Sequence, residues 1–286
     1  MAKVHESDIQ KYWTERPMIL PGGGFDFDRA TPDEIIAHVD TMARKNQRWF
    51  MTSQSAPFLS RYIDFAQLKG KTVLEIGYGV GWLLNEFKKA GADVYGIDLS
   101  HKHYEISSHR FRGDPRVHLQ VASAEAIPFE DQFFDFVAAY GVLHHAADDR
   151  RCYDEVYRVL KPGGKAFLML YRKGGPKYYW RKLFRQGILR GGLLKHRFNV
   201  EKFIYSVTDA YQNDSPGAPI SRHYSRNDVL DRLRKFSRVD LQIAGNTNEW
   251  RNLPFGHLPL SNLLGDNVLR RLTERSGAYW MVNLSK

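Results

Sequence analysis

The sequence predicts an α/β fold built around a mostly parallel β-sheet, and three patterns carry that prediction. An apolar strand runs into three spaced glycines and then a helix-forming segment over residues 73–90. Strand-like and helix-like segments alternate over residues 61–172, and the alternation resumes over residues 225–286. Alternation of this kind is typical of a parallel sheet with helices packed on its faces.

The glycine segment is the strongest signal for a ligand site. Gly77, Gly79 and Gly81 stand at every second position after the strand, and a helix-forming run begins at Trp82. Glycine lets a backbone approach a ligand that a β-carbon would keep away, and the amino end of a helix favours a carboxylate. A dinucleotide fingerprint needs a glycine where Trp82 stands, so the spacing disfavours NAD.

Two carboxylates accompany the glycines. Glu75 lies in the strand just before the turn, and Asp98 ends the next apolar strand, residues 93–97. An acid at the end of a second strand suits the two ribose hydroxyls of an adenosine. We therefore expect Asp98 to hold a ribose and Glu75 to hold the amino group of the same ligand, directly or through water.

The spacing from Glu75 to Gly81, E-x-G-x-G-x-G, resembles motif I of the class I S-adenosylmethionine-dependent methyltransferases. The resemblance extends over residues 70–172 and is closest to the broad subfamily that contains the ubiquinone and menaquinone biosynthesis methyltransferases. It implies a Rossmann-like, seven-stranded, mostly parallel sheet whose last strand runs antiparallel. It also implies S-adenosyl-L-methionine as cofactor, S-adenosyl-L-homocysteine as product, and no metal.

Further segments follow in the order of this family. Residues 123–129 resemble the loop that grips adenine, although members often carry Asp where this chain has Ser123. Residues 134–140 resemble the fourth strand. The resemblance thus implies a set of cofactor-binding residues: Glu75, Gly77, Tyr78, Gly79, Gly81, Asp98, Leu99, Ser123, Ala124, Glu125 and Tyr140.

Residues 141–145 form the loop that would face the transferable methyl group. Methyl transfer from a sulfonium needs mainly in-line positioning, and a base is required only when the acceptor must lose a proton. Histidine titrates near neutrality, so His145 and His144 are the candidate catalytic bases, with ordering of the loop as the alternative role. Tyr140 is a candidate for cation–π stabilisation of the sulfonium.

Residues 1–60 are predicted to form an N-terminal helical cap before the core. Helix starts are expected at Ser7 and at Thr31, each followed three residues later by Gln or Glu. Tyr12 and Trp13 are candidate acceptor contacts in this cap, although helix packing explains them equally well.

The core proper is predicted over residues 61–172, where the cofactor binds. The rest of the sheet falls within residues 225–286, with strands at 239–244 and 278–284 and a second insertion at 247–276. A capping box at Ser225 begins the helix that precedes the first of these strands.

A basic insertion, residues 173–224, follows the fifth strand. Residues 171–202 hold ten Lys or Arg and one acid, which is +9 of the overall +10. A helix is predicted over residues 176–190. Its apolar face carries Trp180, Leu183, Phe184 and Ile188, and its basic residues Arg181, Lys182 and Arg185 point elsewhere.

Four interpretations of the insertion are open: a lid over the site, a surface lying on an anionic membrane, a phosphate-binding surface for RNA or DNA, and a solvated face with no role. Its ends should lie beside the ligand, because ligands bind beyond the carboxyl ends of parallel strands. Arg222, His223 and Tyr224 are therefore candidate acceptor contacts, or residues that pack the base of a lid.

Composition excludes several other classes of protein. A single cysteine, Cys152, excludes a disulfide framework and multi-cysteine chemistry, and is consistent with a cytoplasmic location. No apolar run approaches the about 18 residues of a spanning helix, and the first residues lack a signal peptide. His101 and His103 are expected to be solvated residues at a helix start, and no spacing suggests a metal site.

These observations predict an enzyme that methylates an O or N atom of a small or lipid-like acceptor. One alternative is a nucleic-acid (RNA) methyltransferase that uses the basic insertion. Against it, amino-base methylases carry an Asn/Asp-Pro-Pro-aromatic loop where this chain has residues 139–142. The other alternative is a protein that binds S-adenosylmethionine without turnover. The sequence determines neither the acceptor nor the oligomeric state.

Overall fold

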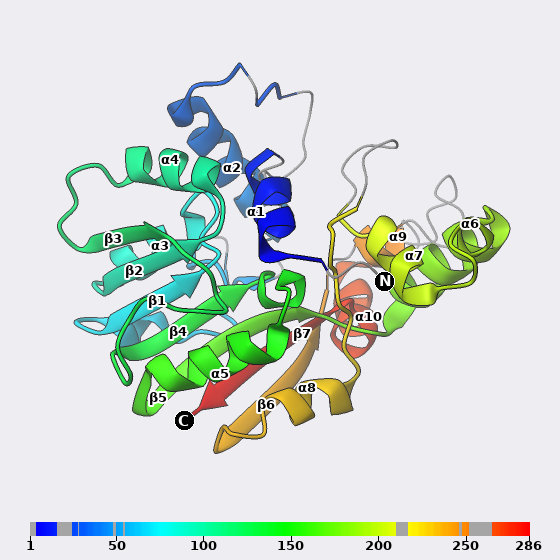
Figure 1. Ribbon diagram of the computed structural model, residues 1–286. Coiled ribbons are helices and arrows are strands. Elements are labelled where there is room, and N and C mark those ends of the chain that lie inside the picture. The colour runs from blue at the N-terminus through cyan, green and yellow to red at the C-terminus, as the bar shows by residue number, and fades with distance from the viewer. Residues whose placement is uncertain are drawn as a thin grey trace.

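The computed structural model describes residues 4–15, 25–27, 29–47, 50–53, 55–209, 217–245, 248–251 and 265–286. A single seven-stranded sheet runs through its centre in the order β3-β2-β1-β4-β5-β7-β6, with helices on both faces (Figure 1). The strands are β1 (Thr72–Ile76), β2 (Asp93–Asp98), β3 (Val117–Val121), β4 (Phe134–Tyr140), β5 (Leu160–Tyr171), β6 (Arg238–Ala244) and β7 (Tyr279–Ser285).

Strand direction confirms the predicted fold class. The neighbours from β3 to β5 all pair in parallel. The last strand, β7, lies between β5 and β6 and pairs antiparallel with both. The chain order reverses between β1 and β4, which is where an open α/β sheet binds its ligand.

The two faces of the sheet carry separate cores, because alternate residues of a strand point to opposite sides. Leu74 and Ile76 of β1 face one core, which α5 (Asp149–Val159) and α8 (Arg226–Arg232) cover. Val73 faces the other, where α3 (Trp82–Lys89) packs. A strand buried on both faces reads as a continuous apolar run, as the sequence of β1 does.

Two helices of the N-terminal part, α1 (Glu6–Glu15) and α2 (Pro32–Gln47), contact α4 (His101–Arg110), the helix between β2 and β3. The expected start at Ser7 is wrong: α1 begins one residue earlier, and the side chain of Asp8 accepts from the His5 N–H. The start at Thr31 is confirmed, with Thr31 and Glu34 exchanging side-chain and backbone hydrogen bonds.

The basic insertion folds as η4 (Lys177–Leu189), α6 (Gly192–Lys195) and α7 (Val200–Ser206). Its two ends meet, because Tyr224 pairs with Arg172 beside the end of β5. The part of the second insertion that the structure describes contains α9 (Asn248–Arg251) and α10 (Asp266–Ser276); residues 246–247 and 252–264 lie outside the described residues.

The predicted apolar face of residues 176–190 is wrong. The segment η4 is a π-helix, and its buried residues are Tyr178, Lys182 and Gly187. Hydrogen bonds from i to i+5 widen the turn beyond the 3.6 residues of an α-helix, so residues four and five apart align instead. Ile188, one of the four residues of the predicted apolar face, is 61% exposed, and Lys182, expected to point away from that face, is buried.

None of the helices in the described part of the chain combines the length and the apolar character that crossing a membrane requires.

Candidate active site

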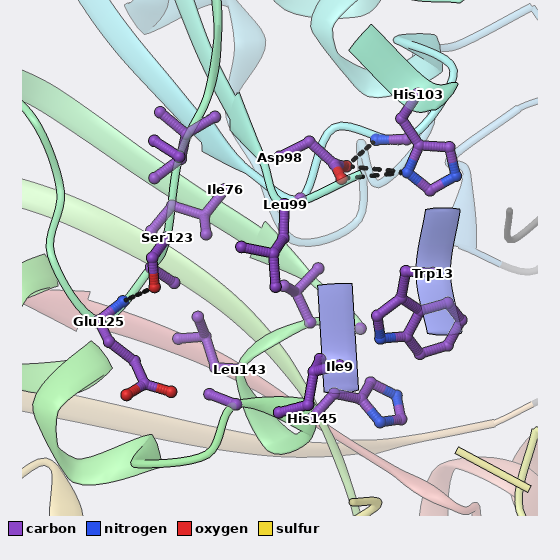
Figure 2. Close-up of a pocket in the computed structure, with 18 of the residues that line it drawn as sticks. Ile9, Trp13, Ile76, Asp98, Leu99, His103, Ser123, Glu125, Leu143 and His145 are labelled. Carbon is purple, nitrogen blue, oxygen red and sulfur yellow. Dashed lines mark hydrogen bonds and ion pairs between the residues drawn. The ribbon is translucent and has the colours of Figure 1, made fainter. Parts of the chain in front are cut away.

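A pocket lies where β1, β2, β3 and β4 end, and helix α1 contributes part of its lining (Figure 2). Gly77 and Gly79 come from the turn after β1, and Asp98 and Leu99 from the end of β2. Its walls are mostly apolar, with Ile76, Ile97 and Leu143 among them. Apolar walls with a few convergent polar groups are typical of small-molecule sites.

The glycine turn presents bare backbone to this pocket. Gly79 has a φ of +56°, and a β-carbon built there would meet nothing within 4 Å, so the space in front of it is open. A β-carbon at Gly77 would lie 2.2 Å from a methyl group of Val142, which allows the loop after β4 to approach closely. The two glycines therefore do different work: one exposes backbone and the other admits the neighbouring loop.

Asp98 is buried at the same end of the pocket. It accepts hydrogen bonds from the N–H groups of Gly79, at 2.9 Å, and Ser100, at 2.8 Å, and its carboxylate lies 3.1 Å from Nδ1 of His103. Burial alone would raise the pKa of Asp98, but His103 and the two N–H donors outweigh it and lower the pKa. The carboxylate is thus ionised and rigidly aimed.

His103 corrects an expectation. The H-x-H spacing suggested solvated residues at a helix start, and His103 is instead 4% exposed and lines the pocket. Ser100 caps helix α4, so the first turn of that helix folds back over Asp98. Figure 2 shows the pair at one end of the pocket, away from Ser123 and Glu125.

The structure brings together many of the predicted site residues. The pocket lining includes Trp13, Gly77, Gly79, Asp98, Leu99, Ser123, Ala124, Glu125, Tyr140 and His145. Other predicted residues lie outside that lining: Glu75, Tyr78, Gly81, His144, Tyr12, Arg222, His223 and Tyr224.

The cofactor candidates outside the lining support the turn from behind. Burial, and then the charge of Asp98, raise the pKa of Glu75 well above its usual value, and its Oε2 has no partner among the described residues. Tyr78 packs in the core against Gly96, whose β-carbon position would lie 2.7 Å from the ring. Gly81 is the N-cap of α3, with a φ of 76°.

Glu6 is a pocket residue that the sequence did not indicate. Its carboxylate accepts from the hydroxyl of Ser123, in the loop where the family often has Asp. The Ser123 hydroxyl also accepts from the N–H of Glu125, at 3.0 Å. One signal was available: Glu6, Ile9 and Trp13 share one face of α1 at helical spacing, and all three line the pocket.

His145 lies at the other end of the pocket, with its ring 5.0 Å from that of Trp13 (Figure 2). Its Nδ1 is 2.6 Å from the carbonyl oxygen of Ile220. A carbonyl only accepts, so Nδ1 carries the proton and Nε2 keeps its lone pair. Nε2 lies 3.5 Å from the carboxylate of Asp209.

The environment keeps His145 neutral. Burial lowers its pKa, and the opposing charge of Asp209 does not fully compensate. A neutral ring with a lone pair at Nε2 is the form that a general base requires. His144 is fully buried, its ring 3.9 Å from that of Tyr171, and neither ring nitrogen has a partner among the described residues.

Three of the remaining acceptor candidates donate hydrogen bonds within the fold. Tyr12 donates to the backbone oxygen of Asp209. Arg222 donates to the carbonyl groups of Ala146 and Ala147. Tyr224 donates to Asp149 at 2.7 Å. The contacts of Arg222 and Tyr224 are of the kind expected of residues that pack the base of a lid.

Two further chemistries find no support in the described residues. Cys152 is fully buried on α5, and burial raises the pKa of its thiol well above the usual value. Across the described ranges, no group of three His, Cys, Asp or Glu side chains could hold a metal ion.

Comparison with known proteins finds a methyltransferase domain in the core. The family model described as "Methyltransferase domain" matches residues 74–168. Phosphoethanolamine N-methyltransferase 2 of Caenorhabditis elegans is 34% identical over 127 residues, which cover 42% of this chain and 28% of that protein. Ubiquinone biosynthesis O-methyltransferase of Pseudomonas putida is 28% identical over 189 residues, covering 61% and 81%.

Solved structures share the fold. Phosphoethanolamine N-methyltransferase 2 of Haemonchus contortus, solved with phosphomonomethylethanolamine and S-adenosylhomocysteine, superposes with a TM-score of 0.52. It is 17% identical, and the match covers 87% of this chain and 58% of that one. A methyltransferase from Methanosarcina mazei gives the same TM-score and identity, covering 80% and 97%.

The chain spans only part of several relatives. It covers 28% of the C. elegans protein and 41% of demethylmenaquinone methyltransferase from Clavibacter sepedonicus. The sheet order, the glycine turn beside Asp98 and the domain match together show that residues 74–168 form a methyltransferase domain of the class I S-adenosylmethionine-dependent type.

Proposed function

We propose that the protein transfers the methyl group of S-adenosylmethionine to an O or N atom of a small or lipid-like acceptor. One observation carries the proposal: a single pocket is lined by the bare backbone of Gly79, the carboxylate of Asp98 and the side chain of His145. The names of the relatives, one an N-methyltransferase and one an O-methyltransferase of small molecules, support this acceptor class.

The residues of the pocket fit the cofactor. Asp98 would accept hydrogen bonds from ribose hydroxyls, sharing or replacing its contact with His103. Apolar side chains such as Ile97 and Leu99 would contact the heterocycle. Tyr140, also in the lining, would place a ring near the sulfonium. When bound, S-adenosylmethionine supplies an activated methyl group.

The chain itself must orient the acceptor and take up its proton. Nε2 of His145 would accept that proton, which leaves an imidazolium 3.5 Å from Asp209. The carboxylate stabilises the new charge, and Trp13 shields the ring from water on one side. Base assistance of this kind typically contributes about 10²- to 10⁴-fold in rate.

The division of the chain into units and its cellular location are also proposals. We propose four units: an N-terminal cap (1–60), the core (61–172), the basic insertion (173–224) and the remainder of the sheet (225–286). Support comes from the separate small core of the insertion, built on Tyr178, Phe203 and Ile204. A cytoplasmic location rests on cysteine usage alone.

The test uses S-adenosylmethionine with an isotopically labelled methyl group, the purified protein and a fractionated cell extract. We expect label in a small-molecule or lipid fraction, located by mass spectrometry. Label in RNA would instead favour the nucleic-acid alternative. Tight cofactor binding with label in no fraction would favour binding without turnover.

A further inference from the structure

Exposed apolar side chains gather on one part of the molecule. Among the described residues, nine large hydrophobic side chains are exposed, and seven of them lie between residues 179 and 200. These seven define the outer face of the insertion: Tyr179, Phe184, Ile188, Leu189, Leu194, Phe198 and Val200. Soluble surfaces normally scatter such residues singly, and a cluster marks an interaction site.

The same surface is strongly basic. Residues 171–202 carry ten Lys or Arg against Glu201 as their one acid. The hydroxyl of Tyr205 donates to Glu201. The exposed bases of the stretch interleave with the apolar residues: Lys173, Arg181, Arg190, Lys195, Arg197 and Lys202.

The outer face is held rigidly. Tyr178, Phe203 and Ile204 form a small core beneath it. A β-carbon at Gly192 would lie 2.5 Å from the ring of Phe203, so α6 packs closely on α7. The turn between them holds Phe198 70% exposed at a φ of +59°, a conformation that non-glycine residues rarely adopt. Packing and strain therefore keep the apolar groups outside.

We propose that the outer face of the insertion docks on an anionic phospholipid bilayer. Basic side chains meet the headgroups, and side chains such as Ile188, Leu189 and Phe198 enter the boundary of the acyl chains. Nucleic acid would satisfy the charges but leave the aliphatic groups without a partner. A second copy of this face would repel the first, because both carry the same excess of positive charge.

The outer face lies apart from the active site. The buried side of η4 carries Lys182, whose ammonium donates to the hydroxyl of Thr208 and lies 3.0 Å from Nε2 of His223. Figure 1 shows α6 and α7 at the far end of the insertion, away from β1, β2 and β3. Docking would thus leave the strand ends free while placing one side of η4 on lipid.

The experiment measures flotation of the full-length protein with vesicles of phosphatidylcholine, alone or with phosphatidylglycerol. We expect binding to the mixed vesicles only, weakening as salt is raised. The variant Arg190→Gln/Lys195→Gln/Arg197→Gln should bind about 100-fold more weakly, since each base near an anionic surface contributes about fivefold. Its control, Lys69→Gln/Arg226→Gln/Arg234→Gln, removes three exposed bases elsewhere and should bind normally.

A second pair of variants tests the apolar contribution. Ile188→Gln/Leu194→Gln/Phe198→Gln should lose vesicle binding, while Tyr104→Gln/Val268→Gln, at the two exposed positions outside the insertion, should keep it. Circular dichroism checks that each variant is folded. Three results would overturn the proposal: no binding to anionic vesicles, equal binding by both members of a pair, or tight binding to an RNA oligonucleotide without vesicle binding.

Discussion

At the scale of single residues, hydrogen bonds from the fold orient the polar side chains of the pocket. Asp98 is aimed by two backbone N–H groups, one of them from Gly79, which can adopt its left-handed conformation at little cost. His145 is fixed by the carbonyl of Ile220 on one side and faces Asp209 on the other. Both oxygens of Asp98 already accept hydrogen bonds from backbone N–H groups, so a ligand would share this carboxylate or replace its contact with His103.

Asp98→Ala should weaken S-adenosylmethionine binding about 10- to 100-fold, because a buried carboxylate that bonds hydroxyls contributes about 1.5–3 kcal/mol. Isothermal titration calorimetry measures the change. Asp93→Ala is the matched control: it removes an exposed acid at the other end of β2 and should leave affinity unchanged. Unchanged affinity in Asp98→Ala would refute the ribose assignment.

The pH profile tests His145. Because burial lowers the pKa of His145 in the folded protein, the ring is already neutral at pH 7. As the pH is raised, kcat/KM should therefore increase up to about pH 6.5 and stay constant above it. His145→Gln should remove that acidic limb and reduce kcat about 10²- to 10⁴-fold. Asp209→Asn should move the limb to lower pH, since Asp209 raises the pKa of His145.

Exposed His101 provides the control for this profile. His101→Gln should leave both the rate and the limb unchanged. Full activity in His145→Gln would exclude this histidine as the base, and an unmoved limb in Asp209→Asn would exclude the electrostatic role of Asp209.

At the scale of elements, local sequence predicts the strands better than it predicts η4. Strand bounds follow from short apolar runs between turn residues, and the capping box at Ser225 begins α8 as predicted. The face of η4 depends on which hydrogen-bond register the packed insertion selects. The buried ammonium of Lys182 donates to the hydroxyl of Thr208 and lies beside Nε2 of His223. Both partners come from distant parts of the insertion.

Lys182→Met should stabilise the protein by about 1–2 kcal/mol at pH 7, because apolar groups often replace buried charges favourably. Burial, followed by repulsion from Lys177, lowers the pKa of Lys182 to about 7. Between that pH and the unfolded value of 10.5, the unfolded chain binds more protons, so this lysine makes stability rise with pH. Urea unfolding of wild type and variant at pH 7 and 9.5 measures both effects.

The gain from Lys182→Met should shrink at pH 9.5, where the lysine is neutral in the folded protein. Lys195→Met, at an exposed position of α6, is the control and should change stability little at either pH. A destabilised Lys182→Met variant would mean that the ammonium contributes more through Thr208 and His223 than its burial costs.

At the scale of the whole molecule, the first helix completes the pocket. Glu6 reaches Ser123 across 117 positions of sequence, and Gln10 donates to the carbonyl of Leu99. Trp13 closes the pocket beside His145. The N-terminal cap therefore brings a carboxylate to the loop that lacks the family's Asp.

Glu6→Ala should lower S-adenosylmethionine affinity about 10-fold, because a carboxylate near Ser123 can accept from the amino group of adenine. Glu15→Ala is the matched control, since Glu15 lies at the other end of α1 and its side chain is 57% exposed. Titration with S-adenosylmethionine compares the two. Equal affinities would mean that Glu6 only holds α1 against Ser123.

The sequence by itself determined the sheet, the strand that ends in the glycine turn, and Asp98 at the end of the next strand. Those features depend on local periodicity and on backbone conformations that few residues tolerate. Only the tertiary structure decided that Glu6 and His103 line the pocket, that Glu75 and Tyr78 lie behind it, and that Lys182 points inward. These outcomes depend on contacts between segments far apart in the chain, and a local pattern shows at most which residues share a face, not what that face contacts.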